Sequence, residues 1–265
     1  MPEFEHDGWR LAYDDRGDGP AVILIHGVLF DATQFEPQVE ALSDRYRVIT
    51  PDLRAHGRSE HRREEYDQWD LMEDHVALLD HLGVERAVWG GVSQGGFQSH
   101  RAALKHPEQV AGLILIDSQA GPEDENRAPM FEASAQVAAE SGWNEELLGL
   151  ATTFLFAESA SDDLKRHWID RWMRQETFDA VELMHVVTRR EDLTDRMGEI
   201  TVPAIVIHGE EDVSIEMEKA EEMAATLGGE VQFVRVPGAG HSSTIERPDV
   251  VNAAIESFLE RAWPA

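Results

Sequence analysis

The sequence predicts an α/β protein built on a mostly parallel, doubly wound sheet. Three observations carry this prediction: short aliphatic and β-branched runs recur along the chain, helical patterns separate them, and the runs are apolar throughout rather than alternating. Strands that alternate with helices form such a sheet, and uninterrupted apolar strands are those covered on both faces. With 265 residues, of which 42% are hydrophobic, the chain is long enough for one large domain, or one domain with an insertion.

The strands are marked by their composition and by the turn residues that end them. A leading β-hairpin is predicted over Glu3–His6 and Trp9–Asp14, because Asp7 and Gly8 between them suit a tight turn. Each later run is followed within two residues by Gly, Pro or Asp. These six predicted strands are Ala21–Ile25, Arg47–Thr50, Ala87–Trp89, Leu113–Ile116, Ala204–Ile207 and Val231–Val236.

Two helices are predicted by apolar residues that recur on one face. The first face ends at Leu82, where Gly83 can close the helix as a C-cap. The second follows Pro248, since proline is favoured in the first turn of a helix. The apolar positions are Trp69, Met72, Val76, Leu79 and Leu82 in the first helix, and Val251, Ala254, Ile255, Phe258 and Leu259 in the second.

The alternation stops between residues 122 and 198, where no strand pattern appears and the segment reads as helical. We therefore expect residues 1–121 and 199–265 to form the core domain and residues 122–198 to form a helical insertion. The insertion follows the strand that ends at Asp117. It should therefore cover the carboxyl edge of the sheet, which is where open α/β sheets bind ligands.

Aromatic residues of the insertion are candidates for the wall of a substrate pocket. Because aromatic side chains usually pack together, we expect most of them to form the insertion's own core and one or two to face the pocket. An apolar pocket would suit an apolar acyl or aryl group. The candidate substrate contacts are Trp143, Trp168 and Trp172, with Leu29 and Phe30 from the loop after the first parallel strand.

Charge and cysteine content exclude several classes of partner. The chain has 23 basic and 52 acidic residues, a formal net charge of −29, and no basic stripe, so we expect neither nucleic acid nor an anionic membrane as a partner. The only lysines are Lys105, Lys165 and Lys219. This acidic, lysine-poor composition fits a high-salt cytoplasm, or an arginine-biased genome with ordinary solubility. Without cysteine there is no disulfide, thiolate nucleophile or Cys-based metal site.

The N-terminal residues, the short apolar runs and the missing motifs predict a cytoplasmic protein without a cofactor. Residues 1–10 lack a basic region followed by an apolar stretch, and no apolar run approaches the ~20 residues of a membrane span. The dinucleotide, P-loop and zinc-protease motifs are missing. We therefore expect no metal or organic cofactor, and a monomer or homodimer.

The motif G-V-S-Q-G at residues 91–95 lies between a predicted strand and a predicted helix. So sharp a turn strains the central residue, and glycines two residues away on either side avoid a clash. Ser93 would then stand above the sheet at a helix N-terminus, where partial positive charge favours a developing anion. We interpret Ser93 as a nucleophile; the alternative is an incidental serine in a glycine-rich turn.

A serine nucleophile needs a general base, because its hydroxyl is otherwise unreactive at neutral pH. His241 follows the last predicted strand in a glycine-rich loop that can hold the imidazole over Ser93. A carboxylate should orient the imidazole, and Asp212 and Asp117 both follow strands at the same edge of the sheet. Six other histidines lie in polar stretches and are expected to be solvated: His61, His75, His81, His100, His106 and His167.

Two backbone N–H groups should stabilise the negative oxygen that forms during attack. The residue after the nucleophile, Gln94, supplies one, and Val28 in the loop after the first parallel strand is best placed to supply the other. His26 precedes this loop, and we expect it to hold the shape of the loop rather than to react.

Four motifs in this order resemble the α/β-hydrolase superfamily, in particular its serine-nucleophile, esterase-like branch with a helical cap. They are H-G-V at residues 26–28, D-L-R-A-H-G-R-S at residues 52–59, G-V-S-Q-G-G at residues 91–96, and G-H at residues 240–241. In the second motif Ala55 stands where glycine is commoner. We expect Asp52, Arg54 and His56 of this motif to be structural.

The resemblance implies that the insertion is a cap and that substrate enters between cap and sheet. The family order of Ser, Asp and His favours Asp212 over Asp117 as the acid. A serine at the elbow, where some relatives carry aspartate, favours acyl-enzyme chemistry. We expect a carboxylesterase whose partners are an acyl substrate and water. Alternatives are perhydrolase or haloperoxidase, lactonase, C–C hydrolase or acyltransferase activity on the same triad, or a non-catalytic receptor.

Overall fold

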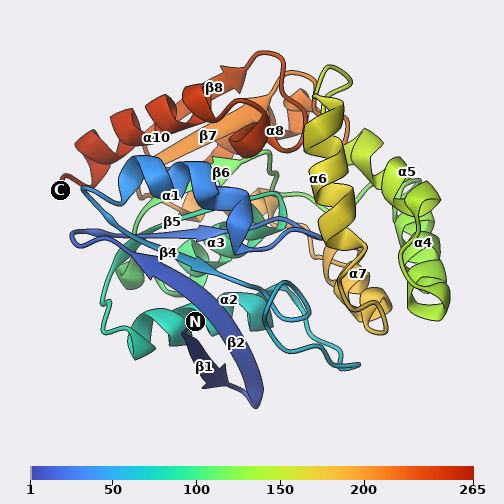
Figure 1. Ribbon diagram of the computed structural model, residues 1–265. Helices are drawn as coiled ribbons and strands as arrows, with labels where there is room; N and C mark the ends of the chain where they lie inside the picture. The colour runs from blue at the N-terminus through green and yellow to red at the C-terminus, as the bar shows by residue number, and fades with distance from the viewer. Residues whose placement is uncertain (1) are drawn as a thin grey trace.

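Every strand predicted from the sequence lies in one sheet, and turn residues separate these strands along the chain. The computed structural model describes residues 2–265; Met1, the first residue of the predicted core domain, lies outside them. The strand order is β1-β2-β4-β3-β5-β6-β7-β8, which confirms the predicted α/β fold (Figure 1). The strands are β1 Glu3–His6, β2 Trp9–Arg16, β3 Ala21–Ile25, β4 Arg47–Pro51, β5 Ala87–Val92, β6 Val110–Ile116, β7 Ala204–Gly209 and β8 Val231–Val236.

Only β2 runs against the direction of the other strands of the sheet. Asp7 and Gly8 between them have φ angles of 46° and 77°, and this pair of left-handed residues is what the tightest hairpin turns need. β1 pairs antiparallel with β2, and β2 pairs antiparallel with β4. All the other strand pairs are parallel, so β3 to β8 end at one common edge.

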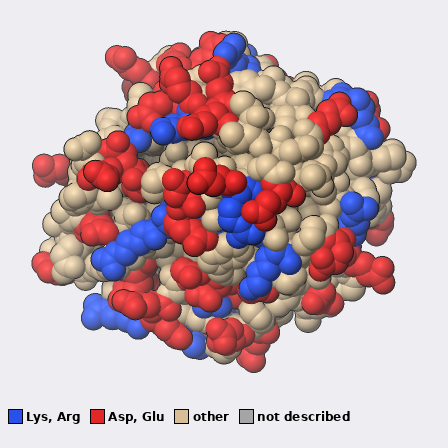
Figure 2. Space-filling model, turned by 180° about the vertical axis from the view of Figure 1, so that it is seen from behind, with Lys and Arg blue, Asp and Glu red and all other residues tan. Residues whose placement is uncertain are grey.

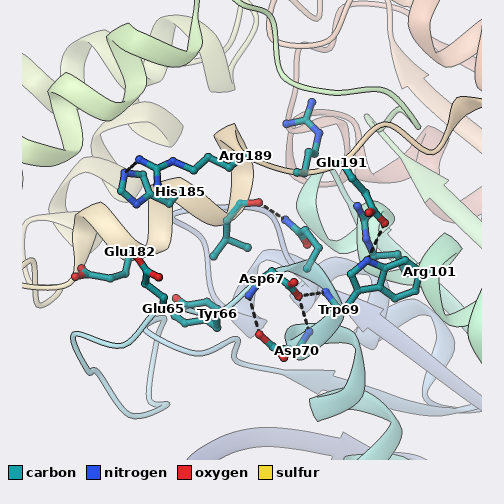
Figure 3. A pocket seen from close by; sticks show the side chains of 13 residues that line it. Glu65, Tyr66, Asp67, Trp69, Asp70, Arg101, Glu182, His185, Arg189 and Glu191 are labelled. Atoms are coloured by element: carbon teal, nitrogen blue, oxygen red, sulfur yellow. Dashed lines mark hydrogen bonds between the residues drawn. The ribbon is translucent and has the colours of Figure 1, made fainter.

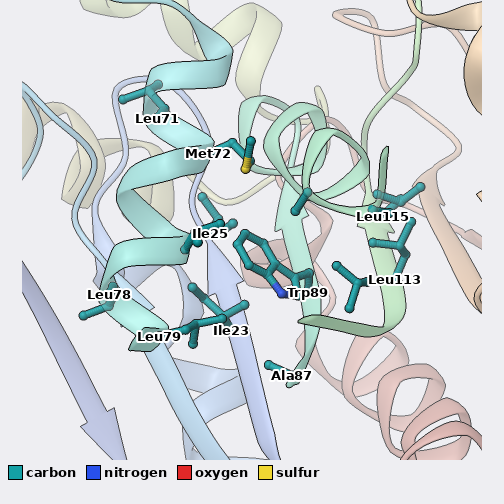
Figure 4. Packing of buried hydrophobic residues seen from close by; sticks show 14 of the residues in the cluster. Ile23, Ile25, Leu71, Met72, Leu78, Leu79, Ala87, Trp89, Leu113 and Leu115 are labelled. Carbon is teal, nitrogen blue, oxygen red and sulfur yellow. The ribbon is translucent and has the colours of Figure 1, made fainter. Parts of the chain in front are cut away.

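Helices cover both faces of the sheet. α1 and α10 pack on one face, while α2, α3 and α8 pack on the other. Trp89 of β5 lies at the centre of the second face, with Ile25, Leu113 and Met72 around it (Figure 4). The helices of the core are α1 Glu36–Leu42, α2 Gln68–His81, α3 Gln94–Lys105, α8 Met217–Thr226, α9 Ser243–Glu246 and α10 Pro248–Ala262, with 3₁₀ turns at Ala32–Phe35 and Pro107–Gln109.

The last strand departs from the expectation that all parallel strands are covered on both faces. β8 pairs only with β7 and forms the edge of the sheet, so most of its side chains are half-buried and Arg235 is exposed. Its sequence already carries the polar residues Gln232 and Arg235. Charged side chains on an edge strand discourage pairing with another chain.

Four helices stand between β6 and β7, in the segment predicted as a helical insertion. They lie together at one side of the sheet in Figure 1, and no strand occurs between residues 122 and 198. α4 packs against α7, and α5 packs against α6. Their bounds are α4 Ala128–Ser141, α5 Glu145–Leu155, α6 Asp162–Trp172 and α7 Ala180–Thr188, followed by a 3₁₀ turn at Thr194–Glu199.

Acidic side chains dominate the surface, as the net charge requires. On the face seen in Figure 2 they surround most of the arginine and lysine side chains. Many arginines form ion pairs with acidic neighbours, for example Arg45 with Glu260 and Arg196 with Glu199. Within residues 2–265, no helix is long and apolar enough to span a bilayer.

Candidate active site

Ser93 occupies the strained turn between β5 and α3. Its φ of 51° and ψ of −109° lie outside the regions that residues with a side chain favour. A Cβ on Gly91 would come within 2.4 Å of the Gly95 backbone, and a Cβ on Gly95 within 2.0 Å of the Ile25 carbonyl oxygen. Both glycines are therefore required by close backbone approach, which is the reason the motif has this spacing.

His241 and Asp212 meet across two loops at the carboxyl edge of the sheet. The Nδ1 atom of His241 lies 2.8 Å from Asp212 Oδ2. The other carboxylate oxygen of Asp212 accepts the N–H groups of Ser214 and Ile215, at 2.8 and 3.0 Å, so the carboxylate is fixed in place. Burial alone would lower the pKa of His241, but Asp212, together with the Asp117 and Glu123 carboxylates, raises that pKa above its ordinary value.

Asp117, the other candidate acid, has different partners. It is fully buried with a φ of 45°, and Oδ1 accepts the Gly209 N–H at 2.9 Å. Oδ2 accepts both the N–H and the hydroxyl of Ser243, at 3.0 and 2.7 Å. Asp117 thus ties together the loops after β6, β7 and β8, while His241 hydrogen-bonds to Asp212. Burial raises the pKa of Asp117.

In the loop after β3, the backbone N–H of Val28 differs from those of its two neighbours Leu29 and Phe30. The Leu29 N–H donates to His56 Nε2 at 3.3 Å, and the Phe30 N–H donates to the Gly27 carbonyl at 3.2 Å. Among the described residues, the Val28 N–H has no such acceptor. Gln94 is the first residue of α3, so its N–H also lacks a partner within the helix.

His26 and His56 hold the shape of this loop. His26 Nδ1 donates to the Gly27 carbonyl and Nε2 accepts the Leu53 N–H, at 2.8 and 3.0 Å. Complete burial lowers the pKa of His26 to about 4 and that of His56 to about 3, so both rings are neutral at physiological pH. Both imidazoles have their nitrogens occupied by the backbone, which agrees with a structural role.

Ser93 and His241 both line an apolar cavity of about 100 Å³ between the sheet and the inserted helices. Leu29 and Trp143, two of the predicted substrate contacts, line this cavity. Most other residues of the cavity wall were not predicted. Helical periodicity identifies the apolar face of an inserted helix but not the part of the molecule that this face contacts. The missed side chains that contribute are Phe97, Met130, Phe131, Leu147, Phe154, Leu155, Met184 and Val187.

Three predicted substrate contacts lie elsewhere. Phe30, Trp168 and Trp172 do not line the cavity and instead pack on each other, with ring centroids 4.6 Å apart for Phe30 and Trp168. They are almost completely buried, together with Phe156. Aromatic rings that fill the space between helices have no surface left for a ligand, so these residues form a hydrophobic core of the insertion.

A buried ion pair at the cavity was also missed. Glu123 lines the cavity and its carboxylate accepts a hydrogen bond from Arg190 Nη1 at 2.8 Å. Both side chains are almost fully buried. No sequence motif marks this pair, since the two residues are far apart in the chain and meet only through the fold of α4 and α7.

A larger cavity of about 440 Å³ lies away from Ser93. It opens between the start of α2 and α7, with Asp67, Asp70 and Tyr66 on one side and His185 and Arg189 on the other (Figure 3). Several of its groups are already engaged: the Asp67 carboxylate caps α2, and the indole N–H of Trp69 donates to Glu191. It contains no serine and no hydrogen-bonded acid–base pair.

Two histidines that we expected to be solvated are buried. His75 Nε2 lies 2.6 Å from Gln98 Oε1, and burial lowers its pKa to about 4. His100 lies on the inner face of α3, where burial holds its pKa well below its usual value. Both helices pack against the sheet, so a histidine in a polar stretch can still lie on the inner face.

One group of side chains in residues 2–265 has the proximity of metal ligands. Ligand atoms of Asp117, His208 and Asp212 lie within 4.8 Å of one another. These atoms already have protein partners: His208 Nε2 bonds the Ile215 carbonyl at 2.9 Å, and the two carboxylates accept the N–H groups described above. A metal would have to displace these hydrogen bonds.

Fold and site together define a class of protein. A strained serine between a parallel strand and a helix shares a cavity with a histidine that is bonded to an aspartate, which is the arrangement of α/β proteins with a nucleophile elbow. Residues 20–248 match the family model described as the alpha/beta hydrolase fold. The chain belongs to this family, as the resemblance implied.

Similar proteins share the fold but differ in named activity. A non-heme haloperoxidase from Rhodococcus erythropolis is 28% identical over 268 residues, with 96% of this chain and 97% of that protein covered. A thermophilic esterase from Thermogutta terrifontis superposes with a TM-score of 0.90 at 29% identity, covering 98% of this chain and 97% of that chain. An enol-lactonase from Burkholderia xenovorans LB400 gives a TM-score of 0.88 at 25% identity, covering 98% and 100%.

Proposed function

We propose that this protein hydrolyses carboxylic esters through an acyl-enzyme on Ser93. The observation that carries the proposal is the hydrogen-bonded pair of His241 and Asp212 beside a cavity that Ser93 also lines. His241 is the general base and Asp212 orients its imidazole. The similarity to a solved esterase supports the same reaction class.

The proposed reaction proceeds in two matched halves. The Ser93 hydroxyl attacks the ester carbonyl while His241 takes its proton, and the N–H groups of Val28 and Gln94 stabilise the negative oxygen. His241 then gives the proton to the departing alcohol, and the acyl group remains on Ser93. A water molecule repeats the attack with His241 as base and releases the acid.

The cavity supports a small or medium, apolar acyl or aryl group. Its wall is mostly aromatic and aliphatic, and its volume of about 100 Å³ leaves little room for a long chain. Its lining side chains include no lysine or arginine, and Glu123, the acidic one, is already paired with Arg190, so an anionic acyl group would find no lysine or arginine partner in the wall. We further propose that residues 122–198 act as a cap and that substrate enters beneath them.

A panel of chromogenic esters, lactones and amides tests this function, with Ser93→Ala as the critical variant. We expect short apolar esters to be the best substrates and Ser93→Ala to lower kcat at least about a thousandfold. Ser257→Ala, on the exposed side of α10, is the matched control and should retain full activity. Turnover that persists in Ser93→Ala would rule out the mechanism.

Two other activities on the same residues are favoured by specific similarities. The haloperoxidase relative favours peroxide-dependent halogenation, and the enol-lactonase structure favours opening of a cyclic ester. Assays for halogenation with added peroxide and for lactone hydrolysis, run beside the ester panel, separate the three. The substrate with the highest kcat/KM identifies the activity.

A further inference from the structure

Glu246 contacts the backbone on both sides of His241. It is the last residue of the short helix α9, and its side chain turns back toward the loop after β8. Its Oε1 accepts the Gly240 N–H at 3.0 Å and the Ser242 N–H at 3.3 Å. One carboxylate oxygen therefore fixes the two peptide groups that flank the proposed base.

The second oxygen of the same carboxylate reaches the inserted helices. Oε2 of Glu246 accepts the Ala157 N–H at 2.9 Å, just beyond the end of α5. The two backbones are in direct contact there, because a Cβ on Gly240 would lie 2.4 Å from the Ala157 nitrogen. Glu246 thus joins the loop of His241 to the insertion through three backbone N–H groups.

The segment bound by Glu246 also contacts the loop of the acid and the cavity. We call residues 154–157 the docking segment. The hydroxyl of Ser214, next but one to Asp212, donates to the Phe154 carbonyl at 2.8 Å. Phe154 and Leu155 both line the cavity that Ser93 shares. The docking segment therefore lies against the loops of both Asp212 and His241 while forming part of the cavity wall.

We infer that Glu246 is a positioning residue that couples the seating of the docking segment to the placement of His241. This inference rests on the proposed function only for the role of His241; the coupling is a property of the contacts themselves. A carboxylate that accepts three N–H groups from two segments holds them in one geometry, and the loss of one contact weakens the others. Substrate binding beneath the inserted helices would then act on the base through Glu246.

The pKa of Glu246 differs from that of an exposed glutamate. Burial raises its pKa to about 7, against the three N–H groups that lower it, and the nearby Asp117 carboxylate raises it further. An ordinary surface glutamate would not show this balance, and perturbed carboxyl groups gather at functional sites.

The test compares Glu246→Gln with Glu256→Gln, a matched change on α10 that breaks no hydrogen bond of the site. Glutamine has one acceptor oxygen, so either the loop side or the docking-segment side meets an NH₂ group instead. We expect amide hydrogen exchange to quicken about tenfold in residues 240–242 and in the docking segment together. Exchange elsewhere, and in Glu256→Gln, should stay unchanged.

The same variants are then assayed on the best ester. We expect Glu246→Gln to lower kcat about tenfold with KM changed less than about threefold, because a misplaced base affects chemistry more than binding. An unchanged kcat would overturn the positioning role. If the wild-type protein shows no Ser93-dependent turnover, the proposed function fails, and the exchange result still decides the coupling.

Ser214→Ala provides a second route that leaves Glu246 intact. It removes the hydroxyl that holds Phe154 while keeping the backbone N–H that holds Asp212. We expect it to loosen the docking segment and, through Glu246, residues 240–242 as well. Loosening of the docking segment alone, in this variant or in Glu246→Gln, would show that the two segments are independent and would overturn the inference.

Discussion

At the scale of single residues, Asp212 affects the pKa of His241 and therefore its charge. Against the effect of burial, Asp212 is the main group that raises the pKa of the imidazole above its ordinary value, with smaller contributions from Asp117 and Glu123. In the proposed mechanism, only the neutral imidazole accepts a proton from Ser93. Activity should therefore be complete above the His241 pKa and decline as the pH falls through it, so the pair sets the acid limb of the pH profile.

The pH dependence of kcat/KM tests this relationship. We expect its acid limb in the wild-type protein to lie at a higher pH than that of an ordinary histidine. Asp212→Asn removes the charge that raises the His241 pKa, so the limb should move to lower pH while kcat falls by about 10³-fold or more. Asp80→Asn, an exposed site on α2, is the control. A limb that stays in place in Asp212→Asn would mean that another group raises the pKa.

Ala55 adopts a backbone conformation that favours glycine. Its φ of 60° lies in the left-handed region, which costs a residue with a Cβ about 1 kcal/mol relative to glycine. Ala55→Gly should therefore raise the free energy of unfolding by about 1 kcal/mol, measured by urea denaturation. Ala253→Gly, at an exposed position inside α10, should instead lower it by a similar amount. Destabilisation by both changes would refute the strain argument.

At the scale of elements, two tryptophans of the insertion lie in different surroundings. Trp143 lines the cavity, whereas Trp168 packs in the aromatic core of the insertion with Phe30 and Trp172. Trp143 lies between α4 and α5 and forms part of the cavity wall, whereas Trp168 lies in α6 and fills the space between helices.

Truncation of each tryptophan distinguishes these roles. Trp143→Ala enlarges the cavity and should shift the preferred acyl chain to a longer one, as read from kcat/KM across an ester series. Trp168→Ala removes a buried ring and should cost about 3–5 kcal/mol of stability with no change in chain-length preference. The prediction fails if the two variants exchange these effects.

Acidity is the dominant property at the scale of the whole molecule. A net charge of −29 creates repulsion between carboxylates that salt screens. Thermal unfolding should therefore shift to higher temperature as NaCl rises from about 0.05 to 1 M, by several degrees. KCl should act equally, because screening does not depend on the cation. A midpoint that stays constant would show that the surface ion pairs already balance the repulsion.

Much of the fold and part of the site follow from local patterns. Apolar runs and turn residues predict the strands within a few residues, and the glycines around Ser93 predict the elbow because their close approach is a local steric need. β8 is different: only its place at the sheet edge, which the sequence pattern does not state, explains why its side chains are half-exposed.

The sequence by itself determined the α/β alternation, the helical insertion and the positions of Ser93 and His241 at strand ends, because periodicity and backbone sterics act over a few residues. The order of the motifs favoured Asp212 over Asp117, and the tertiary structure places Asp212 against His241. The tertiary structure alone decided that Trp143 rather than Trp168 lines the cavity and that Glu246 reaches Ala157. These outcomes depend on how distant segments pack, and such packing is set by the shape of the whole chain.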